Sequence, residues 1–208
     1  NFNAQALSNT AWAFATAGYE APELFNAISA EAVRRRLGNF TEQNLSNTAW
    51  AFATAGHEAP ELFHAISAEA VRRRLGGFNE QALSNTAWAF ATAGHEAPQL
   101  FDAISAEAVR RRLCGFKEQE LSNAAWAFAT AGHEAPELFN AISAEAVRRR
   151  LDGFNLQHLC NTAWAFATVD HPSPELFNAI SAQALRRGLE NFNAQALSNT
   201  AWAFATAG

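Results

Sequence analysis

The phrase LSNTAWAFATAG at residues 7–18 decides the fold of this chain, because it returns at a fixed spacing. Identical or nearly identical copies occupy residues 45–56, 83–94, 121–132, 159–170 and 197–208. Each copy begins 38 residues after the one before it, without a single insertion. A constant period of this length is typical of repeat proteins, in which each repeat is one supersecondary unit.

The chain divides into five full repeats and a half repeat. The full repeats occupy residues 1–38, 39–76, 77–114, 115–152 and 153–190, and the half repeat at 191–208 copies residues 1–18 letter for letter. We expect one continuous array over residues 1–208, with no second domain and no linker. The array lacks the polar terminal repeats that solenoids need. We therefore expect it to be a segment of a longer protein, whose targeting segment and any catalytic domain lie outside it.

The first half of each repeat predicts a helix, called helix A below, which covers residues 4–17 in the first repeat. Asn3 is well suited to cap its N-terminus, and Phe2 can pack on Leu7 as a hydrophobic staple. Gly18 supplies the left-handed residue that commonly ends a helix.

The second half of each repeat predicts helix B. It opens with Pro22 at the first helical position, runs through Leu37, and ends at Gly38. Two antiparallel helices cannot bury their apolar faces alone, so neighbouring repeats must stack. The predicted fold is all-α, a right-handed α-solenoid of two-helix, 38-residue repeats.

Helix A has one clear apolar stripe, which we expect to face helix B. The stripe consists of Leu7, Ala11, Phe14 and Ala15. Trp12 lies off this stripe, beside Gln5 and Thr16. A second large apolar residue indicates a second packed surface, toward a neighbouring repeat. We therefore expect Trp12 to be a core residue rather than a platform for base stacking.

The remaining arc of helix A is small and polar, and consists of Ala6, Asn9, Thr10, Ala13 and Ala17. Small side chains allow a ligand to approach the helix closely, and Asn and Thr offer both donors and acceptors. The first helix usually lines the concave surface in two-helix solenoids. The alternative is that Asn9 bonds a backbone group between repeats and fixes their stagger. Both interpretations remain open.

The sixth position of the repeat varies while most others do not, and it reads Ala6, Asn44, Ala82, Glu120, His158 and Ala196. The turn before helix A varies as well, at Gly38, Gly76, Cys114, Asp152 and Glu190. A fixed scaffold with one changing polar group per repeat is typical of proteins that read one base per repeat. The alternative is drift at exposed sites.

All fourteen arginines lie at the end of helix B, as in Arg34, Arg35 and Arg36. Cations are favourable at a helix C-terminus, and Glu31 is placed to pair with Arg34 or Arg35. The helix C-terminus and Glu31 account for two arginines but not for the third. Stacking the repeats would produce a basic ridge suited to phosphates, despite the net charge of −5.

The predicted RNA-binding residues follow from these two patterns. They are Ala6, Asn9, Thr10, Asn44, Asn47, Thr48, Ala82, Asn85, Thr86, Glu120, Asn123, His158, Asn161 and Thr162, with Arg36, Arg74, Arg112 and Arg150 for the phosphates.

Other chemistry is not expected. His57, His95, His133 and His171 fall one per repeat, too far apart to share a metal ion. Cys114 and Cys160 occupy different places in the repeat, which argues against a disulfide framework. No segment is apolar enough to span a membrane. We expect no cofactor and no enzymatic activity in this segment, and the acidic total argues against indiscriminate coating of nucleic acid.

The phrase F-x-x-Q-x-L-S-N-T-A-W-A-F-A-T-A-G, followed by A-P-E-L-F and a basic end of helix B, resembles the octotricopeptide repeat family over the whole chain. The resemblance implies single-stranded RNA binding on the concave face, about one nucleotide per repeat, in transcript processing, stability or translation. It also implies a chloroplast or mitochondrial location. Repeat five departs from the pattern at residues 169–174 and at Gly188, which replaces the third arginine.

The alternative function is a protein- or peptide-binding α-solenoid scaffold. Such a groove is expected to present exposed aromatic or leucine anchors, whereas the arc is made of Ala, Asn and Thr. The last helix A also lacks a partner helix, so its face of Leu197, Ala201 and Phe204 is expected to be uncovered. We therefore expect end-to-end association between chains or fraying of this helix.

Overall fold

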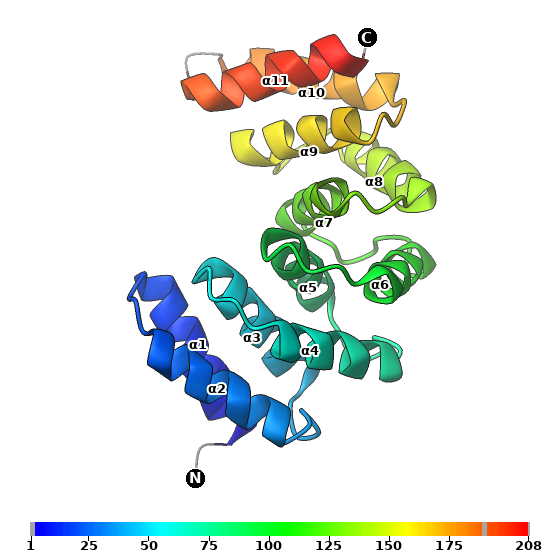
Figure 1. Cartoon of the computed structure of the whole chain (residues 1–208). Helices are drawn as coiled ribbons and strands as arrows, with labels where there is room; N and C mark the ends of the chain where they lie inside the picture. The colour runs from blue at the N-terminus through cyan, green and yellow to red at the C-terminus, as the bar shows by residue number, and fades with distance from the viewer. Residues whose placement is uncertain (1–2, 189–190, 208) are drawn as a thin grey trace. The chain divides into compact units, whose positions relative to one another are not determined.

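The computed structural model describes residues 3–188 and 191–207, and within them it contains eleven helices and no strand. The helices are α1 (Ala4–Ala17), α2 (Pro22–Arg34), α3 (Glu42–Thr54), α4 (Pro60–Arg72), α5 (Glu80–Thr92), α6 (Pro98–Arg110), α7 (Glu118–Ala131), α8 (Pro136–Arg148), α9 (Leu156–Thr168), α10 (Pro174–Arg187) and α11 (Ala194–Ala207). This confirms the predicted all-α repeat (Figure 1). The staple by Phe2 and the variable residue Glu190 lie outside the described residues.

Odd-numbered helices are the A helices and even-numbered ones the B helices. The chain forms two compact units, Asn1–Glu107 and Ala108–Gly208, called the N-terminal and C-terminal parts below. Each part has the same internal arrangement. Whether the repeats form one continuous domain, and with which superhelical hand, stays a prediction.

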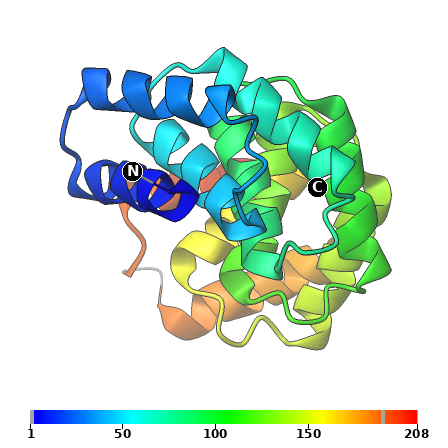
Figure 2. The ribbon, with the colours of Figure 1, turned by 90° about the horizontal axis from the view of Figure 1, so that it is seen from below.

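Within each part, the A helices pack against one another along their lengths. In the N-terminal part α3 lies between α1 and α5, and in the C-terminal part α9 lies between α7 and α11. The B helices α2 and α4 form a second layer beside α1 and α3, and they contact each other at few residues (Figure 1, Figure 2). The A layer is therefore the more tightly packed layer. Its many alanines allow this, since Ala49 and Ala87 are completely buried.

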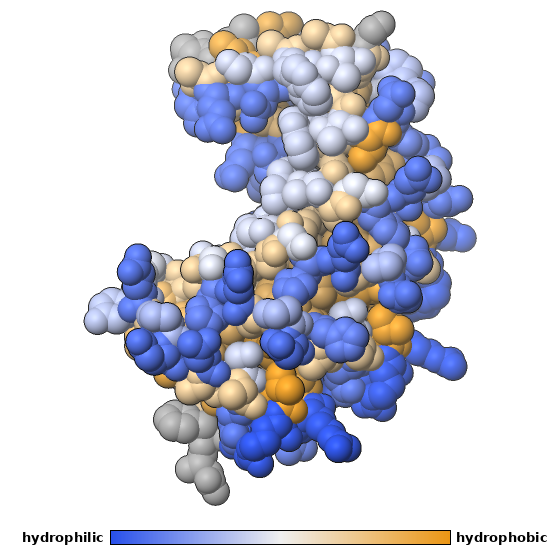
Figure 3. Space-filling model, in the orientation of Figure 1, coloured by the Kyte–Doolittle hydropathy of each residue, from blue (hydrophilic) through white to orange (hydrophobic). Residues whose placement is uncertain are grey.

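Phenylalanines fill the space between a B helix and the next A helix. Phe25 meets Phe52 edge to face with ring centroids 5.0 Å apart, and Phe139 and Phe166 repeat the arrangement at 5.0 Å. Such pairs contribute about 0.5–1.5 kcal/mol beyond their buried area. On the surface of Figure 3, hydrophilic side chains cover much of the B helices, and hydrophobic ones appear as small separate spots.

The helix ends follow the predicted signals with one exception. The Asn3 Oδ1 accepts a hydrogen bond from the Ala6 N–H at 2.8 Å, and Gly18 adopts a left-handed φ of 62°. Helix α2 begins at Pro22 as expected, but it ends at Arg34 rather than at Leu37. Arg36 and Leu37 are both left-handed, at φ 53° and 52°. This reversal turns Leu37 back into the core, where it is fully buried.

The last helix leaves part of its apolar face open. Leu197 is 41% exposed, whereas its counterparts in the interior repeats are fully buried. Ala201 is also exposed. Phe204 is covered in part, because its ring meets that of Phe177 at 5.2 Å. The predicted face is therefore open at two of its three residues.

We expect the 208-residue chain to associate through this face, because exposed apolar surface favours contact with another surface. Sedimentation velocity should show a weight-average mass that rises with concentration. The Leu197→Glu variant should remain closer to the monomer. A wild-type chain that stays monomeric at every concentration, with the α11 amides protected from hydrogen exchange, would contradict this expectation.

Candidate nucleic-acid interface

A single line of side chains stays open to solvent on the interior helices α3 and α5. In α3 the only side chains that are not buried, besides Glu42, are those of Gln43, Asn47, Trp50 and Thr54. Their spacing of four, three and four residues places them along one helix face. The same four residue types recur in each repeat and in the half repeat. We call these residues the Gln-Asn-Trp-Thr stripe: Gln5, Asn9, Trp12 and Thr16; Gln43, Asn47, Trp50 and Thr54; Gln81, Asn85, Trp88 and Thr92; Gln119, Asn123, Trp126 and Thr130; Gln157, Asn161, Trp164 and Thr168; Gln195, Asn199, Trp202 and Thr206.

The amide side chains of the stripe have unused hydrogen-bonding capacity. Among the described residues, the side chains of Asn47, Asn85, Asn123 and Asn161 form no hydrogen bond with the protein. The alternative role of Asn9, a bond to the backbone of a neighbouring repeat, is likewise not seen in the part of the chain that the structure describes. Each amide offers donors and acceptors. The amides of the stripe are thus partly exposed, with donors and acceptors that are free to bind a ligand.

The tryptophans form a ladder along the stripe. Ring centroids lie 6.4 Å apart for Trp12 and Trp50, 6.3 Å for Trp50 and Trp88, and 6.5 Å for Trp126 and Trp164. These rings are equivalent, so the distances give the spacing of repeats at this surface. This ring spacing of 6.3–6.5 Å is smaller than the 8–10 Å that typically separates the axes of packed helices. The stripe therefore lies on the inner side of the local curvature within each part.

The expectation that Trp12 is a core residue is wrong. Its side chain is 46% exposed, and Trp50 and Trp88 in the interior repeats are only half-buried. The rings do pack against those of neighbouring repeats, as expected. Part of each ring remains accessible to solvent.

The arc of small residues lies mostly between A helices rather than on the surface. Thr48, Thr86 and Thr162 are completely buried, whereas Thr10, which has no preceding repeat in this chain, is partly open. These positions therefore face the preceding A helix. Small side chains here allow close approach of a helix, not of a ligand. The Thr86 hydroxyl donates to the Ala82 carbonyl at 2.7 Å.

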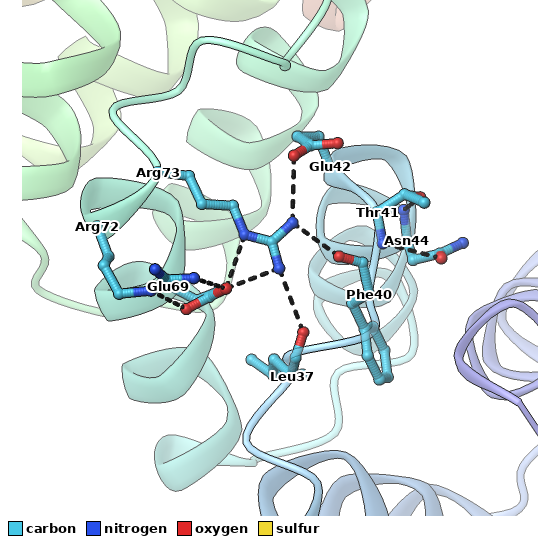
Figure 4. Close-up of polar contacts among 8 residues, drawn as sticks. All are labelled: Leu37, Phe40, Thr41, Glu42, Asn44, Glu69, Arg72 and Arg73. Carbon is cyan, nitrogen blue, oxygen red and sulfur yellow. Dashed lines mark hydrogen bonds and ion pairs between the residues drawn. The ribbon is translucent and has the colours of Figure 1, made fainter.

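The sixth-position side chains cap their own helices. The Thr41 N–H donates to the Asn44 Oδ1 at 3.1 Å (Figure 4), and the Lys117 N–H donates to the Glu120 carboxylate. The His158 Nδ1 accepts from the Asn155 N–H at 3.3 Å. Asn44, Ala82 and Glu120 are buried, His158 and Ala6 partly so. The assignment of this position to base reading stays a prediction, and the capping geometry argues against it.

Two of the three arginines bind a glutamate of their own helix, and the second of them also reaches the turn that leads into helix A. In repeat two, both Arg72 and Arg73 bind Glu69, at 2.7 and 2.6 Å (Figure 4). Arg73 also donates to the Phe40 carbonyl at 2.8 Å and contacts Glu42 at 3.1 Å, both in its own repeat, and it donates to the Leu37 carbonyl of repeat one at 3.4 Å. Hydrogen bonds from Arg72, and then from Arg73, lower the pKa of Glu69 from 4.5 to about 2, although burial opposes them. The sequence predicted the pairing within the helix but not the contact with the turn.

The same link recurs elsewhere with variations. In repeat four, Arg149 donates to the Phe116 carbonyl at 2.7 Å and binds Glu145 at 2.6 Å. In repeat five, Gln183 replaces the glutamate and donates to the Arg150 carbonyl at 2.6 Å. Repeat five therefore contacts the preceding repeat through the neutral Gln183 and through an ion pair of Arg186 with Asp152 at 3.2 Å.

The third arginine of each cluster has no such role. The side chains of Arg36, Arg74, Arg112 and Arg150 are exposed and form no ion pair with the described residues. All four adopt a left-handed backbone, with φ between 52° and 55°. This conformation costs roughly 1–2 kcal/mol for a residue with a side chain but little for glycine. The counterpart in repeat five is Gly188, at φ 82°.

The two edges of the A layer differ in charge, although the arginine edge also carries the first-turn acids Glu42, Glu80 and Glu118. The turns from helix B to helix A bear the third arginines and the N-termini of the A helices, which have a positive partial charge. The opposite edge carries one exposed acidic residue per repeat, namely Glu20, Glu58, Glu96, Glu134 and Asp170. Grooves of about 410 and 380 Å³ between repeats at this second edge are lined by Glu20 and Glu58, respectively. Their carboxylates do not suit a phosphate.

The recurring histidines connect neighbouring repeats. The His57 Nε2 lies 3.0 Å from the Asn26 Oδ1, and its ring packs 5.4 Å from that of Phe25. His171 and Asn140 repeat the contact at 3.0 Å. Residues 3–188 and 191–207 contain no group of three acidic, histidine or cysteine side chains that could hold a metal ion. None of the helices described is long and apolar enough to cross a membrane.

The structure adds Gln, Trp and Thr of the stripe to the predicted set and retains its asparagines. The sequence carried a signal for this, because Trp12 shares its helix face with Gln5 and Thr16. A tryptophan between two polar residues at helical spacing indicates a surface position. The small residues indicated a helix contact, since nothing else in the repeat lets A helices pack so closely.

One comparison with known proteins bears on function. The family model for RNA-editing substrate-binding complex 6 protein matches residues 1–206 of the chain. The match covers almost the whole sequence, so the chain belongs to this family. No curated protein matches the chain significantly. The expectation of a helical repeat protein related to RNA is thereby confirmed at that level, and the matching family is not the octotricopeptide repeat family.

Proposed function

We propose that this member of the RNA-editing substrate-binding complex 6 protein family binds single-stranded RNA along the Gln-Asn-Trp-Thr stripe. The observation that supports it most is the row of half-exposed tryptophans beside unpartnered amides, repeated at every A helix. Aromatic faces stack on bases, and single strands are the nucleic acids whose bases are free to stack on a protein. The amides would bind base edges.

The phosphates would follow the edge that carries the third arginines. These four guanidinium groups are exposed and form no ion pair with the described residues, and one occurs in each of the first four repeats. The positive ends of the A helices lie at the same edge, beside the first-turn acids Glu42, Glu80 and Glu118, and the exposed acids of the A-to-B turns lie at the other. A strand bound in this orientation places bases over the stripe and phosphates beside the arginines. The overall charge of −5 would then not prevent binding.

The repeat spacing limits how the strand is arranged. Stacked nucleotides rise by about 3.4 Å along a strand. The tryptophan ladder advances by 6.3–6.5 Å per repeat, close to twice that rise. One unstacked nucleotide per repeat fits this spacing, as the resemblance to the octotricopeptide repeat family implies. Two nucleotides that stay stacked on each other also fit it, and a footprint length would distinguish the two.

The biological setting is part of the proposal. The family name refers to an RNA-editing substrate-binding complex, so RNA and protein components of such a complex are the partners to test. The resemblance places the function in transcript processing, stability or translation within an organelle. The segment would act by binding, without a cofactor and without catalysis of its own.

The half-exposed tryptophans also favour a second candidate, the protein- or peptide-binding scaffold. The sequence argument against it relied on an arc without aromatic anchors, and the structure places an aromatic ladder on the surface. A peptide that packs on these rings would bind with little dependence on salt. RNA binding would depend on salt strongly, because phosphate contacts release counterions.

Replacing Arg74 by glycine tests the phosphate contact. We expect Arg74→Gly to weaken binding of all single-stranded RNAs alike and to lower the slope of log affinity against log salt by roughly 0.7. The same variant should unfold at an equal or higher temperature, since glycine relieves the left-handed strain at this residue. Lower affinity together with unchanged or higher stability would show that the arginine serves binding. Unchanged affinity and salt slope would contradict the proposed phosphate contact, and Arg74→Lys, which keeps the charge, is the control.

A further inference from the structure

The surface proposed to meet the bases is the same in every repeat, whereas the residues that vary are not on it. Gln, Asn, Trp and Thr occupy the four stripe positions in all six A helices. The most variable position of helix A caps the helix instead, as Asn44 and Glu120 do. The array therefore offers an identical set of donors, acceptors and aromatic faces to each successive nucleotide.

From this identity we infer that the array recognises a run of one base rather than a mixed sequence. This inference rests on the proposed function. If each repeat meets one nucleotide, all repeats must prefer the same base, because equal side chains in equal positions have equal preferences. The preferred ligand is then a single-stranded homopolymeric tract. A strand shifted by one repeat makes the same contacts, so the protein has no fixed register on such a tract.

The varying residues support this inference from the structural side. The Asn44, Glu120 and His158 side chains each accept a hydrogen bond from the backbone three residues earlier in the chain. These three side chains therefore differ in type but have the same role, which is to cap the helix. A code that changes from repeat to repeat would need different residues on the stripe, and the stripe has none.

The test measures affinities of the full 208-residue chain for labelled 12-nucleotide RNAs. The panel contains the adenine, uracil and cytosine homopolymers and several mixed sequences with equal thirds of these bases in different orders. We expect one homopolymer to bind at least about tenfold more tightly than the mixed RNAs, and the mixed RNAs to agree within about twofold. One order preferred strongly over its permutations would overturn the inference, and so would equal binding of the whole panel.

A single-repeat variant makes the test sharper. Asn85→Asp removes the donor of one amide and should alter the preference at one nucleotide only. The favoured homopolymer should lose affinity by about tenfold, and a version with one different base at an internal position should recover part of it. Asn44→Ala is the matched control, since repeats one and three already carry alanine there, and it should leave base preference unchanged. A changed preference in Asn44→Ala would overturn the inference.

These outcomes are separable from the proposed function itself. If the wild-type chain binds none of the RNAs at low salt, the proposed function fails. If it binds RNA but prefers a particular mixed order, the proposed function stands and only the inference about uniform recognition fails.

Discussion

Replacing Trp50 by leucine is expected to weaken the binding of single-stranded RNA by roughly 5- to 150-fold. The estimate follows from base–aromatic stacking, which contributes about 1–3 kcal/mol per base. Trp50 is the central ring of the ladder in the N-terminal part, 6.4 Å from Trp12 and 6.3 Å from Trp88. Leucine keeps much of the apolar contact with those rings but has no π-face. The affinity should be measured by fluorescence anisotropy of a labelled RNA.

Two controls separate stacking from general damage. Trp50→Phe keeps an aromatic face and should retain most of the affinity. Tyr19→Ala removes an aromatic side chain that is 67% exposed but lies off the stripe, and it should leave the affinity unchanged. Equal losses in Trp50→Leu and Tyr19→Ala, or none in either, would exclude the ladder as a stacking surface.

The second large effect concerns stability. We expect Arg73→Ala to lower the free energy of unfolding by about 2–3 kcal/mol, because charged hydrogen bonds are strong and their loss leaves buried partners unpaired. Arg73 links Glu69 to the Phe40 carbonyl of its own repeat and to the Leu37 carbonyl of repeat one, so it joins α4 to the turn between α2 and α3. Arrays of this kind depend on contacts between neighbouring repeats. Urea unfolding followed by circular dichroism measures the change.

Arg72→Ala provides the matched control. Arg72 binds the same carboxylate, but its side chain is 69% exposed and does not reach the preceding repeat. Its loss should cost less than about 1 kcal/mol. If the two variants are equally stable, the contact of Arg73 with the turn at residues 37–42 has no energetic importance.

The Glu69 carboxylate makes the stability of the same network depend on pH. The pKa of Glu69, about 2, lies below its ordinary 4.5, so the ionised form stabilises the fold. This stabilisation is complete above about pH 4.5 and is lost as the pH falls toward 2. Glu145, whose pKa is also about 2, behaves in the same way.

The fold could be predicted from the sequence because its signals are local. Asn3, Gly18 and Pro22 mark helix ends by side-chain chemistry, and the 38-residue period marks the stacking. The end of helix B could not be placed, since Arg36 and Leu37 adopt a left-handed backbone that their residue types disfavour. Packing of Leu37 in the core imposes that reversal. The contacts from Arg73 to Phe40 and Leu37 were equally hidden, because they depend on how α4 packs against the turn before α3.

The candidate site was predicted only in part. The asparagines lie on the open surface, as the RNA-binding interpretation requires, but the neighbouring threonines, as at Thr48, are buried between A helices. Periodicity shows which residues share a helix face, and it cannot show whether that face meets another helix or solvent. Small side chains suit both a ligand and a close helix contact. Only the packing of α3 between α1 and α5 distinguishes these cases.

The intrinsic fluorescence of tryptophan tests the central claim most directly. All six tryptophans occupy the same stripe position, so their emission reports on the proposed RNA surface alone. Titration with a single-stranded RNA should quench this emission, and the quenching should saturate at the concentration where labelled RNA is fully bound. The effect should weaken as salt increases. RNA binding that leaves the tryptophan emission unchanged would contradict the assignment of the stripe as the binding surface.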